Sequence, residues 1–441
     1  MNMGKNARSA ALSALERCER EGAWSAAALD AAIRANELSA RDAALASRLC
    51  LGVLQNGAYL DYYVDLYSKG KLEPRLRLIL RLGAYQLLFL DKVPVHAAVS
   101  ETVELCRDGK LDRAASLANA VLRRIAAVRD DPPPIPGEGS PAWLALRWSH
   151  PLWLAERLTA ERGCTFAEAF FRANNETAPL CLQVNRLRVS EADYLRALER
   201  AGYAVKAFPE LPGCFELDGG KVTELPGYDE GLFYVQDRAA RCAVQIAGAA
   251  PGMRILDACA APGGKSFAAA LDAEARCRII SCDLHEKKLR LVRSGAERLG
   301  LDGCIETQAA DARLFRPDWE WAFDLVIADV PCSGLGVIRK RPEIRKKSQA
   351  ELEGLPAVQA AILENVSRYV KPGGVLLYST CTILKEENRD QIDRFLSCHP
   401  DYAAEDFRCG DLRSEGGCYE FWPQLDGTDG FFAAKLRRKA Q

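Results

Sequence analysis

The sequence lacks the ligand spacing that metal sites in proteins usually require. It contains sixteen cysteines, but no two of them are separated by two residues, and its four histidines, His96, His150, His285 and His399, lie far apart in the chain. Zinc sites usually draw on cysteines and histidines at short, regular spacings. We therefore expect no metal. Sixteen scattered thiols are typical of a reduced, cytoplasmic protein.

Long apolar runs and an excess of charge of one sign are missing as well. No apolar stretch approaches the ~20 residues of a membrane helix, and residues 1–20 carry too many charges for a signal peptide. We expect no membrane interaction. The net charge is −1, so any binding of nucleic acid must rely on local basic patches. A length of 441 residues, with 49% hydrophobic and 27% charged residues, fits two or three globular domains.

The first 128 residues are predicted to be helical, because apolar residues recur at helical spacing, as in Leu45, Leu49 and Val53, and glycine and proline are sparse. Residues 129–149 contain five prolines, at positions 132, 133, 134, 136 and 141. Such a stretch favours an extended, semi-rigid linker. We therefore place a domain boundary there.

Residues 150–235 are predicted to form a small α+β domain. Strands are expected at 180–185, 203–208 and 214–217, with Ser190 as the N-cap of a helix over 191–201.

Residues 236–441 alternate between strand and helix patterns. Strands are expected at 253–256, 278–282, 305–310, 323–328 and 374–379, and helices at 286–299 and 355–370. This alternation predicts an α/β, Rossmann-like domain with a doubly wound parallel sheet.

The loop after the first of these strands has the features of a ligand site. Asp257 ends the strand, and small residues, Pro262, Gly263 and Gly264 lead into a helix. Free backbone N–H groups at such a helix start bind ligands, and glycine lets the backbone approach them closely. A P-loop would require glycine at position 259, where this chain has Cys259. A plain turn, a nucleotide site and an S-adenosylmethionine site remain open from this loop alone.

Four aspartates follow four predicted strands: Asp257, Asp283, Asp311 and Asp329. In a doubly wound sheet the carboxyl ends of the strands open the ligand crevice. Asp283 lies about 20 residues after the glycines, where a carboxylate can accept hydrogen bonds from ribose hydroxyls. Although residues 325–329 resemble a Walker B strand, the ribose-type carboxylate and the missing glycine favour S-adenosylmethionine over ATP.

Two cysteines lie just beyond strand ends, Cys332 after Asp329-Val330-Pro331 and Cys381 after Ser379-Thr380. A lone cysteine is more often a small buried apolar residue, but two that project into one crevice beside a carboxylate suggest chemistry. C5 of cytosine is a poor nucleophile until a thiolate adds to C6. Its methylation needs a nucleophilic cysteine, an acid near N3 and a base for the C5 proton.

Two resemblances narrow the function. Residues 80–89, 93–101 and 118–124 resemble the NusB-type helical domain, a family that binds RNA. Residues 257–265, 329–334 and 379–381, with the closing residues 429–435, resemble the Nol/Nop/Sun-type RNA cytosine-5 methyltransferases. Val330 departs from the Pro or Ala that is frequent in that family.

The second resemblance implies site residues and a reaction. It implies Cys381 as the nucleophile, Cys332 as the thiol that assists product release, and Asp329 as the carboxylate near the base ring. Spacing alone does not say which cysteine attacks. The implied contacts of S-adenosylmethionine are Cys259, Ala260, Ala261, Pro262, Gly263, Gly264, Lys265, Asp283, Asp311 and Asp329. Together the resemblances imply C5 methylation of a cytidine in 16S ribosomal RNA, with an α+β domain of ferredoxin or RRM type between the helical and catalytic domains.

Other functions remain possible at this level. One is methylation of transfer RNA or another RNA, and another is a non-catalytic, NusB-like RNA-binding assembly or transcription factor. The densest basic run covers residues 339–347 and follows Cys332 closely, so we expect it at the rim of the crevice. Arg339, Lys340, Arg341 and Arg345 are its candidate RNA contacts, since cations hold phosphates; a solvated surface run is the alternative. No obligate protein partner is evident.

Overall fold

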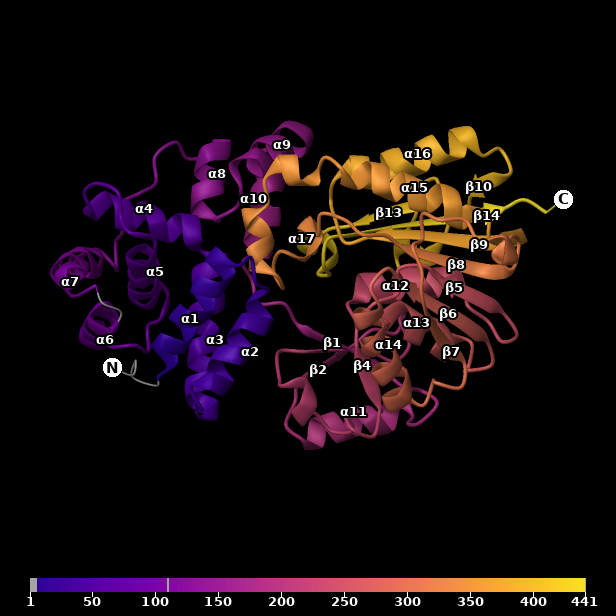
Figure 1. The fold of residues 1–441 in the computed structure, drawn as a ribbon, viewed down its shortest axis with the longest axis horizontal. Helices are drawn as coiled ribbons and strands as arrows, with labels where there is room; N and C mark the ends of the chain where they lie inside the picture. Colours follow the sequence, from indigo (N-terminus) through magenta and orange to yellow (C-terminus); the bar gives the residue numbers. More distant parts are fainter. Residues whose placement is uncertain (1–5, 109–110, 441) are drawn as a thin grey trace. The chain divides into compact units, whose positions relative to one another are not determined.

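The computed structural model describes residues 6–108 and 111–440. The chain forms two compact units (Figure 1). The first comprises Met1–Glu176 together with Ile338–Gln349, and the second comprises Thr177–Val337 and Ala350–Gln441. Among the described residues, no helix has the length and apolar character needed to span a membrane.

The first unit is helical, as the sequence predicted. Its helices are α1 (Ala7–Arg20), α2 (Ser25–Ala35), α3 (Ala40–Gln55), α4 (Gly57–Tyr67), α5 (Pro74–Phe89), α6 (Val95–Asp108), α7 (Asp112–Ala127), α8 (Pro141–Arg147), α9 (Leu152–Arg162) and α10 (Cys164–Ala173). Leu49 and Val53 are buried in its core, at the predicted spacing. A Cβ at Gly52 of α3 would come within 2.0 Å of the ring of Tyr85 on α5, so a small residue is required where these helices meet.

The proline-rich stretch contains no helix until α8 begins at Pro141, where Ser140 caps its N-terminus. The helices α9 and α10 fall within the region that we assigned to the small α+β domain, yet they belong to the compact helical unit. The reason is packing, since α9 lies against α8 and α10, while the strands of that region form a sheet in the other unit.

A small antiparallel sheet opens the second unit. Its strands are β1 (Leu180–Val184), β2 (Val205–Ala207), β3 (Cys214–Leu217) and β4 (Phe233–Val235), in the order β2-β3-β1-β4. Helix α11 (Glu191–Arg200) covers one face with Tyr194 and Leu198, and its cap is the predicted Ser190. The other face contributes Cys181 and Tyr234 to the core of the larger sheet.

The larger sheet has the order β10-β14-β9-β8-β5-β6-β7, with β13 beside β14. Its strands are β5 (Arg254–Asp257), β6 (Arg278–Asp283), β7 (Ile305–Ala309), β8 (Phe323–Asp329), β9 (Val370–Thr380), β10 (Tyr402–Ala404), β13 (Cys418–Phe421) and β14 (Phe431–Arg438). The five strands β5 to β9 are parallel. The expected doubly wound parallel sheet accounts for these five strands, but the whole sheet is mixed, because β14 pairs antiparallel with β9, and β10 and β13 with β14. The short apolar run of residues 431–434 had been attributed to a closing motif and not to a strand.

Helices cover both faces of this sheet (Figure 1). They are α12 (Arg238–Ala247), α13 (Gly264–Asp272) and α14 (Glu286–Leu299) on one face, and α15 (Leu355–Ser367) and α16 (Arg389–Cys398) on the other. Within β8, Leu325 and Ile327 join the first core, whereas Val326 and Ala328 join the second. Side chains of a strand alternate between faces, so a strand covered on both faces is apolar throughout.

The chain order reverses between β5 and β8, with β6 and β7 on one side and β8 and β9 on the other. Loops from the carboxyl ends of β5 and β8 therefore leave the sheet in opposite directions. This is the place where open α/β sheets bind their ligands.

Candidate active site

Two thiols from different loops meet at the carboxyl edge of the sheet. Cys332 follows β8 and Cys381 follows β9, and these strands are paired in register up to Asp329 and Ser379. The Sγ atoms of the two cysteines are 3.2 Å apart. Because the strands are parallel neighbours, their ends bring together residues that are 49 positions apart in the sequence.

The environment of Cys332 disfavours its thiolate. The pKa of the Cys332 thiol is raised well above its usual range by its hydrogen bond with Cys381, by burial, and by the nearby charges of Cys381 and Glu387. A thiol in this state can hold a proton at neutral pH but is a poor nucleophile. Burial and the charge of Glu387 thus favour the neutral form of the Cys332 thiol.

Asp329 lies at the end of β8, three residues before Cys332. Its carboxylate is 2.6 Å from the ammonium of Lys265 and accepts a hydrogen bond of 2.8 Å from the hydroxyl of Ser379. Lys265 is nearly buried, and its ammonium lies 5.1 Å from the centre of the Phe431 ring. A carboxylate and an ammonium are therefore held side by side next to the thiols.

The loop from Cys259 to Lys265 leads from β5 into α13. Gly263 has a φ of 114°, and a Cβ there would lie 2.5 Å from the Phe267 ring, so only glycine fits at this turn. The peptide bond before Pro262 is cis. α13 begins at Gly264, and its first N–H groups point out of the helix toward the end of β5.

Asp257 is fully buried beneath this loop. Its Oδ2 accepts a hydrogen bond of 2.7 Å from Ser266, whose hydroxyl is also 2.7 Å from that of Ser281. Burial raises the pKa of Asp257 to about 7, partly opposed by the Ser266 hydrogen bond. Its other oxygen, Oδ1, is buried without a hydrogen-bond partner.

Two further aspartates follow β6 and β7. Asp283 is buried at the end of β6 and accepts a hydrogen bond of 2.9 Å from the backbone of His285. Asp311 lies two residues beyond β7, and the hydrogen bonds from Arg313 lower the pKa of its carboxyl. A small pocket beside Asp311 has Leu256 and Cys282 among its walls.

These residues fit S-adenosylmethionine, which carries a sulfonium, an ammonium and ribose hydroxyls. Such groups need acceptor oxygens, and the edge offers carboxylates at four strand ends, including the orphaned Oδ1 of Asp257. No group of three or more histidine, cysteine, aspartate or glutamate side chains suited to a metal ion occurs among the described residues.

Comparisons with known proteins identify the family. A family profile described as 16S rRNA methyltransferase RsmB/F matches residues 245–437, the NusB family matches residues 5–127, and an RsmF/B-like, ferredoxin-like methyltransferase domain matches residues 150–223. Ribosomal RNA small subunit methyltransferase B of Erwinia tasmaniensis is 35% identical over 403 residues, which are 90% of each chain. The probable counterpart of Bacillus subtilis is 32% identical over 98% of each chain.

The chain belongs to the ribosomal RNA small subunit methyltransferase B family.

It is thus a 16S rRNA methyltransferase of an S-adenosylmethionine-dependent family. The fold agrees, since the crystal structure of PH0851 superimposes with a TM-score of 0.84 at 25% identity and covers 99% of this chain and 100% of its own. NSun6 from Pyrococcus horikoshii has a TM-score of 0.60 at 21% identity and covers 65% of this chain and 98% of its own. The predicted NusB-like, ferredoxin-like and methyltransferase domains are confirmed.

The basic run of this methyltransferase packs with helices of the helical unit. Residues 338–349, which include the 3-10 helix η4 (Pro342–Lys346), belong to the compact helical unit. Glu343 accepts a hydrogen bond of 2.8 Å from Ser25 of α2, and the ammonium of Lys346 is 2.6 Å from the carboxylate of Glu19 on α1. The guanidinium of Arg341 lies 4.8 Å from the centre of the Trp24 ring.

Arg345 differs from the other candidates in this run because it is buried. Its guanidinium donates to the backbone carbonyls of Gln55, Trp148, Ser149 and Asn174, and to the side-chain oxygen of Asn175, at 2.6–3.1 Å. Burial lowers the pKa of Arg345 to about 9, so it is still a cation at neutral pH. Its two terminal nitrogens are occupied within the protein and its Nε is buried, so we leave Arg345 out of the proposed RNA contacts.

Several arginines of the NusB-like domain are also engaged within the protein. Arg77 and Arg81 both bind Asp61, and Arg75 binds Glu16.

A buried polar cluster behind the two thiols of this methyltransferase was not predicted from the sequence. It contains Ser333, Gln359, Thr382, Glu387 and Asn388, all nearly or fully buried. In the sequence, Lys385-Glu386-Glu387-Asn388 reads as a solvated run of charges. The only available signal was its short distance from Cys381.

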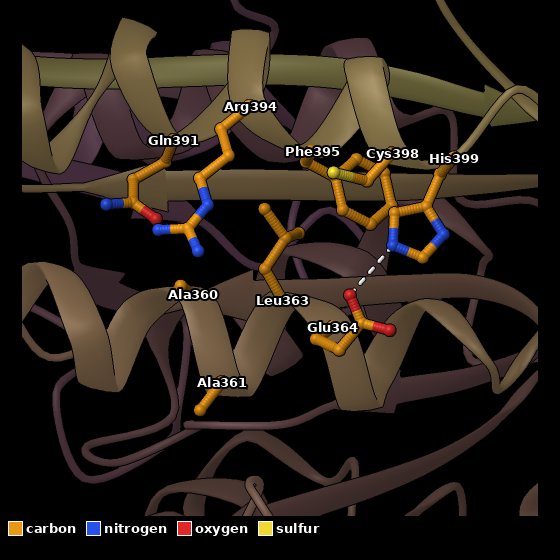
Figure 2. Close-up of a pocket in the computed structure, with 9 residues that line it drawn as sticks. All are labelled: Ala360, Ala361, Leu363, Glu364, Gln391, Arg394, Phe395, Cys398 and His399. Atoms are coloured by element: carbon orange, nitrogen blue, oxygen red, sulfur yellow. Dashed lines mark hydrogen bonds and ion pairs between the residues drawn. The ribbon is translucent and has the colours of Figure 1, made fainter.

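A separate groove lies between α15 and α16 (Figure 2). Within it, Nε2 of His399 is 2.8 Å from Glu364, and the His399 ring stacks on Phe395 with 4.3 Å between centroids. None of the predicted site residues lines this groove. The candidate active site of the methyltransferase is therefore the carboxyl edge of the sheet.

Proposed function

We propose that this enzyme methylates C5 of a cytidine in 16S ribosomal RNA through a covalent bond between Cys381 and C6 of the base. The observation that carries the proposal is the pair of thiols, whose Sγ atoms lie 3.2 Å apart at the carboxyl edge of the sheet. Burial alone would give no reason for two cysteines to project from neighbouring strand ends beside a carboxylate and an ammonium.

The proposed reaction begins when the Cys381 thiolate forms a bond to C6. The electrons of the C5–C6 double bond move so that negative charge develops toward N3 and C5 becomes nucleophilic. We assign Asp329 to the base edge near N3, and the ammonium of Lys265, 2.6 Å from the Asp329 carboxylate, to the negative charge that develops there. S-adenosylmethionine supplies the electrophilic methyl group, which C5 takes.

Release then requires loss of the C5 proton. As a base removes it, the C5–C6 double bond re-forms, the bond to sulfur breaks, and Cys381 leaves as a thiolate. We assign Cys332 to this elimination as that base: its thiolate takes the C5 proton and becomes the thiol, while its sulfur lies against that of Cys381.

We propose that the loop Cys259–Lys265 contacts S-adenosylmethionine and that Asp283 accepts hydrogen bonds from its ribose hydroxyls. Asp311 and Asp329 are proposed to contact the remaining parts of S-adenosylmethionine. For the RNA we propose Arg339, Lys340 and Arg341, which stand on the surface or half-buried. Phosphate contacts of this kind make binding salt-dependent. The domain division at 1–128, 129–149, 150–235 and 236–441 stays a prediction from the sequence, while the compact helical unit extends to Glu176 and so includes α9 and α10. We also propose a cytoplasmic location, where the rRNA is made and free thiols stay reduced.

The two thiols can be told apart on a denaturing gel. Each variant is incubated with labelled 16S rRNA from cells that lack the gene, together with S-adenosylmethionine. We expect Cys381→Ala to form no covalent adduct and to transfer no methyl group. Cys332→Ala should transfer the methyl group and then stall, so that a protein–RNA adduct accumulates.

Cys398→Ala is the matched control, because Cys398 is an exposed thiol at the end of α16. An adduct in Cys381→Ala but none in Cys332→Ala would reverse the two roles. Bisulfite mapping of ribosomal RNA from cells with and without the gene identifies the nucleotide, and an unchanged 16S pattern with a changed transfer RNA would redirect the substrate.

A further inference from the structure

The carboxylate of Glu387 is buried at the end of the 3-10 helix η6 (Lys385–Glu387), with only 1% of the residue exposed. A buried carboxylate is costly unless hydrogen-bond donors surround it. The donors around Glu387 come from the two loops that carry the thiols and from α15, as the distances below show.

On the Cys332 side, Glu387 holds Ser333 directly and Pro331 through Gln359. Its Oε2 accepts a hydrogen bond of 2.9 Å from the backbone N–H of Ser333 and one of 2.8 Å from Nε2 of Gln359. The same Nε2 donates to the carbonyl of Pro331 at 3.0 Å. Cys332 is therefore fixed from the residue before it and from the residue after it.

On the Cys381 side, Glu387 and its neighbour do the same. Oε1 of Glu387 is 3.4 Å from the hydroxyl of Thr382, which is itself 2.6 Å from the hydroxyl of Ser333. Asn388 accepts from the hydroxyl of Thr380 at 2.5 Å and donates to the carbonyl of Thr382 at 3.0 Å. Tyr378 of β9 donates to the backbone carbonyl of Glu387 at 2.7 Å.

We propose that Glu387 is the positioning residue that holds the thiols of Cys332 and Cys381 together, so that one can act directly after the other on the same base. None of these hydrogen bonds joins Glu387 to a reacting atom or to the donor loop Cys259–Lys265. This inference rests on the proposed function for its catalytic meaning, but the spacing of the thiols can be measured without RNA.

The negative charge of Glu387 also affects the protonation of the Cys332 thiol. Its negative charge is one of the causes that raise the pKa of the Cys332 thiol. Glu387 therefore helps to keep a proton on Cys332 while it holds Cys332 beside Cys381.

The test uses two substitutions of Glu387 in the full-length protein. Glu387→Ala removes every side-chain bond to the two loops. Glu387→Gln keeps a carbonyl oxygen that can accept from Ser333 and Gln359 and places its NH₂ toward the Thr382 hydroxyl. The glutamine thus preserves the geometry while it removes the charge.

The first readout is the rate of crosslinking by dibromobimane, in which two thiolates each displace one bromide to form two thioethers. Peptide mapping identifies the Cys332–Cys381 product, and Cys381→Ala gives the background. We expect the rate to fall at least about 10-fold in Glu387→Ala and to stay within about 3-fold of wild type in Glu387→Gln, because crosslinking needs both thiols in place.

The second readout is methyl transfer. We expect kcat to fall about 100-fold in Glu387→Ala, with the KM for S-adenosylmethionine unchanged, since a shift of about 1 Å in a reacting group costs that much. Glu387→Gln should recover most of kcat and displace its pH profile to lower pH, because the pKa of Cys332 loses one of the causes that raise it.

Asp324→Asn is the control. Asp324 lies near the start of β8, at the opposite edge of the sheet, and its carboxylate accepts from the backbone of Arg254 and from Lys371. Thr382→Val is the second variant, in case Glu387→Ala does not fold, because it removes the hydroxyl that joins Ser333 to Glu387. We expect it to slow crosslinking as well.

Wild-type crosslinking in Glu387→Ala and Thr382→Val would overturn the positioning role. So would an equal loss in Glu387→Gln and Glu387→Ala, because charge and not geometry would then be responsible. If crosslinking depends on Glu387 while no variant and no wild-type protein methylates 16S rRNA, the proposed function fails and the positioning role stands.

Discussion

Replacing Arg345 with methionine should unfold the helical unit at lower temperature and leave the donor site intact. Arg345 makes five hydrogen bonds with oxygens of Gln55, Trp148, Ser149, Asn174 and Asn175, four of which are backbone carbonyls. Methionine keeps the apolar part of the side chain but leaves these buried acceptors without a donor.

The magnitude follows from the burial of those groups. A hydrogen bond to a charged group contributes about 1.5–3 kcal/mol, but removal of the cation also relieves its cost of burial, which the lowered pKa of Arg345 reflects. We therefore expect a net loss of about 3–5 kcal/mol, because several buried acceptors lose their donor at about 1–3 kcal/mol each, which the relieved cost of burying the cation offsets in part. For a unit of this size that corresponds to a fall of about 10 °C in the unfolding midpoint.

The assay is thermal unfolding followed by circular dichroism at 222 nm, because the helical unit holds most of the helices. Lys346→Met is the control, since Lys346 is the next residue and pairs with Glu19 near the surface. Such an exposed pair contributes about 0–1 kcal/mol. Calorimetry should show that S-adenosylmethionine binds both variants as it binds the wild type. Equal midpoints for the two variants would refute a structural role for Arg345.

Three further predictions concern other parts of the chain. Burial raises the pKa of Asp257 to about 7, so the folded protein binds more protons than the unfolded one between about pH 4 and 7. The free energy of unfolding should therefore fall by up to about 4 kcal/mol as the pH rises through that range. Urea titrations of Asp257→Asn should lack this decline. In Gly336→Ala, the new Cβ would lie 1.8 Å from the carbonyl oxygen of Gly430 and 2.9 Å from that of Cys381. We expect kcat to fall about 100-fold in the methyl-transfer assay, while thermal scans show a folded protein. Near-normal activity would mean that this loop can shift freely. Deletion of residues 1–128 should cause aggregation, because it exposes buried residues of the segment 338–349. The fraction that stays folded should still bind S-adenosylmethionine in calorimetry. A monodisperse truncated protein in light scattering would contradict the expected aggregation.

The division into a helical part, a small sheet and a large α/β sheet could be predicted because hydrophobic period and turn residues are local. β3 and α14 lie at the predicted residues, and Ser190 caps α11. Strand β14 was missed, although its first four residues are apolar, because the order and direction of strands in a sheet depend on pairing between distant segments.

The sequence by itself determined the chemical groups at the site. Each of Asp257, Asp283, Asp329, Cys332 and Cys381 follows or ends an apolar strand, and parallel strands bring such positions to one edge. It did not determine how these groups are held. The 3.2 Å between the thiols and the raised pKa of Cys332 arise from loops that meet only in the folded chain.

Tertiary structure alone decided two features. The run 339–347 is rich in cations, which predicts an exposed surface, yet it packs in the helical unit and buries Arg345, because enough carbonyl oxygens converge there to replace water around the guanidinium. Glu387 is charged and lies in a polar run, yet it is buried behind the thiols for the same reason. Whether a charged side chain is exposed or buried depends on the donors and acceptors that distant segments place around it, and a local pattern of residue types contains no record of those segments.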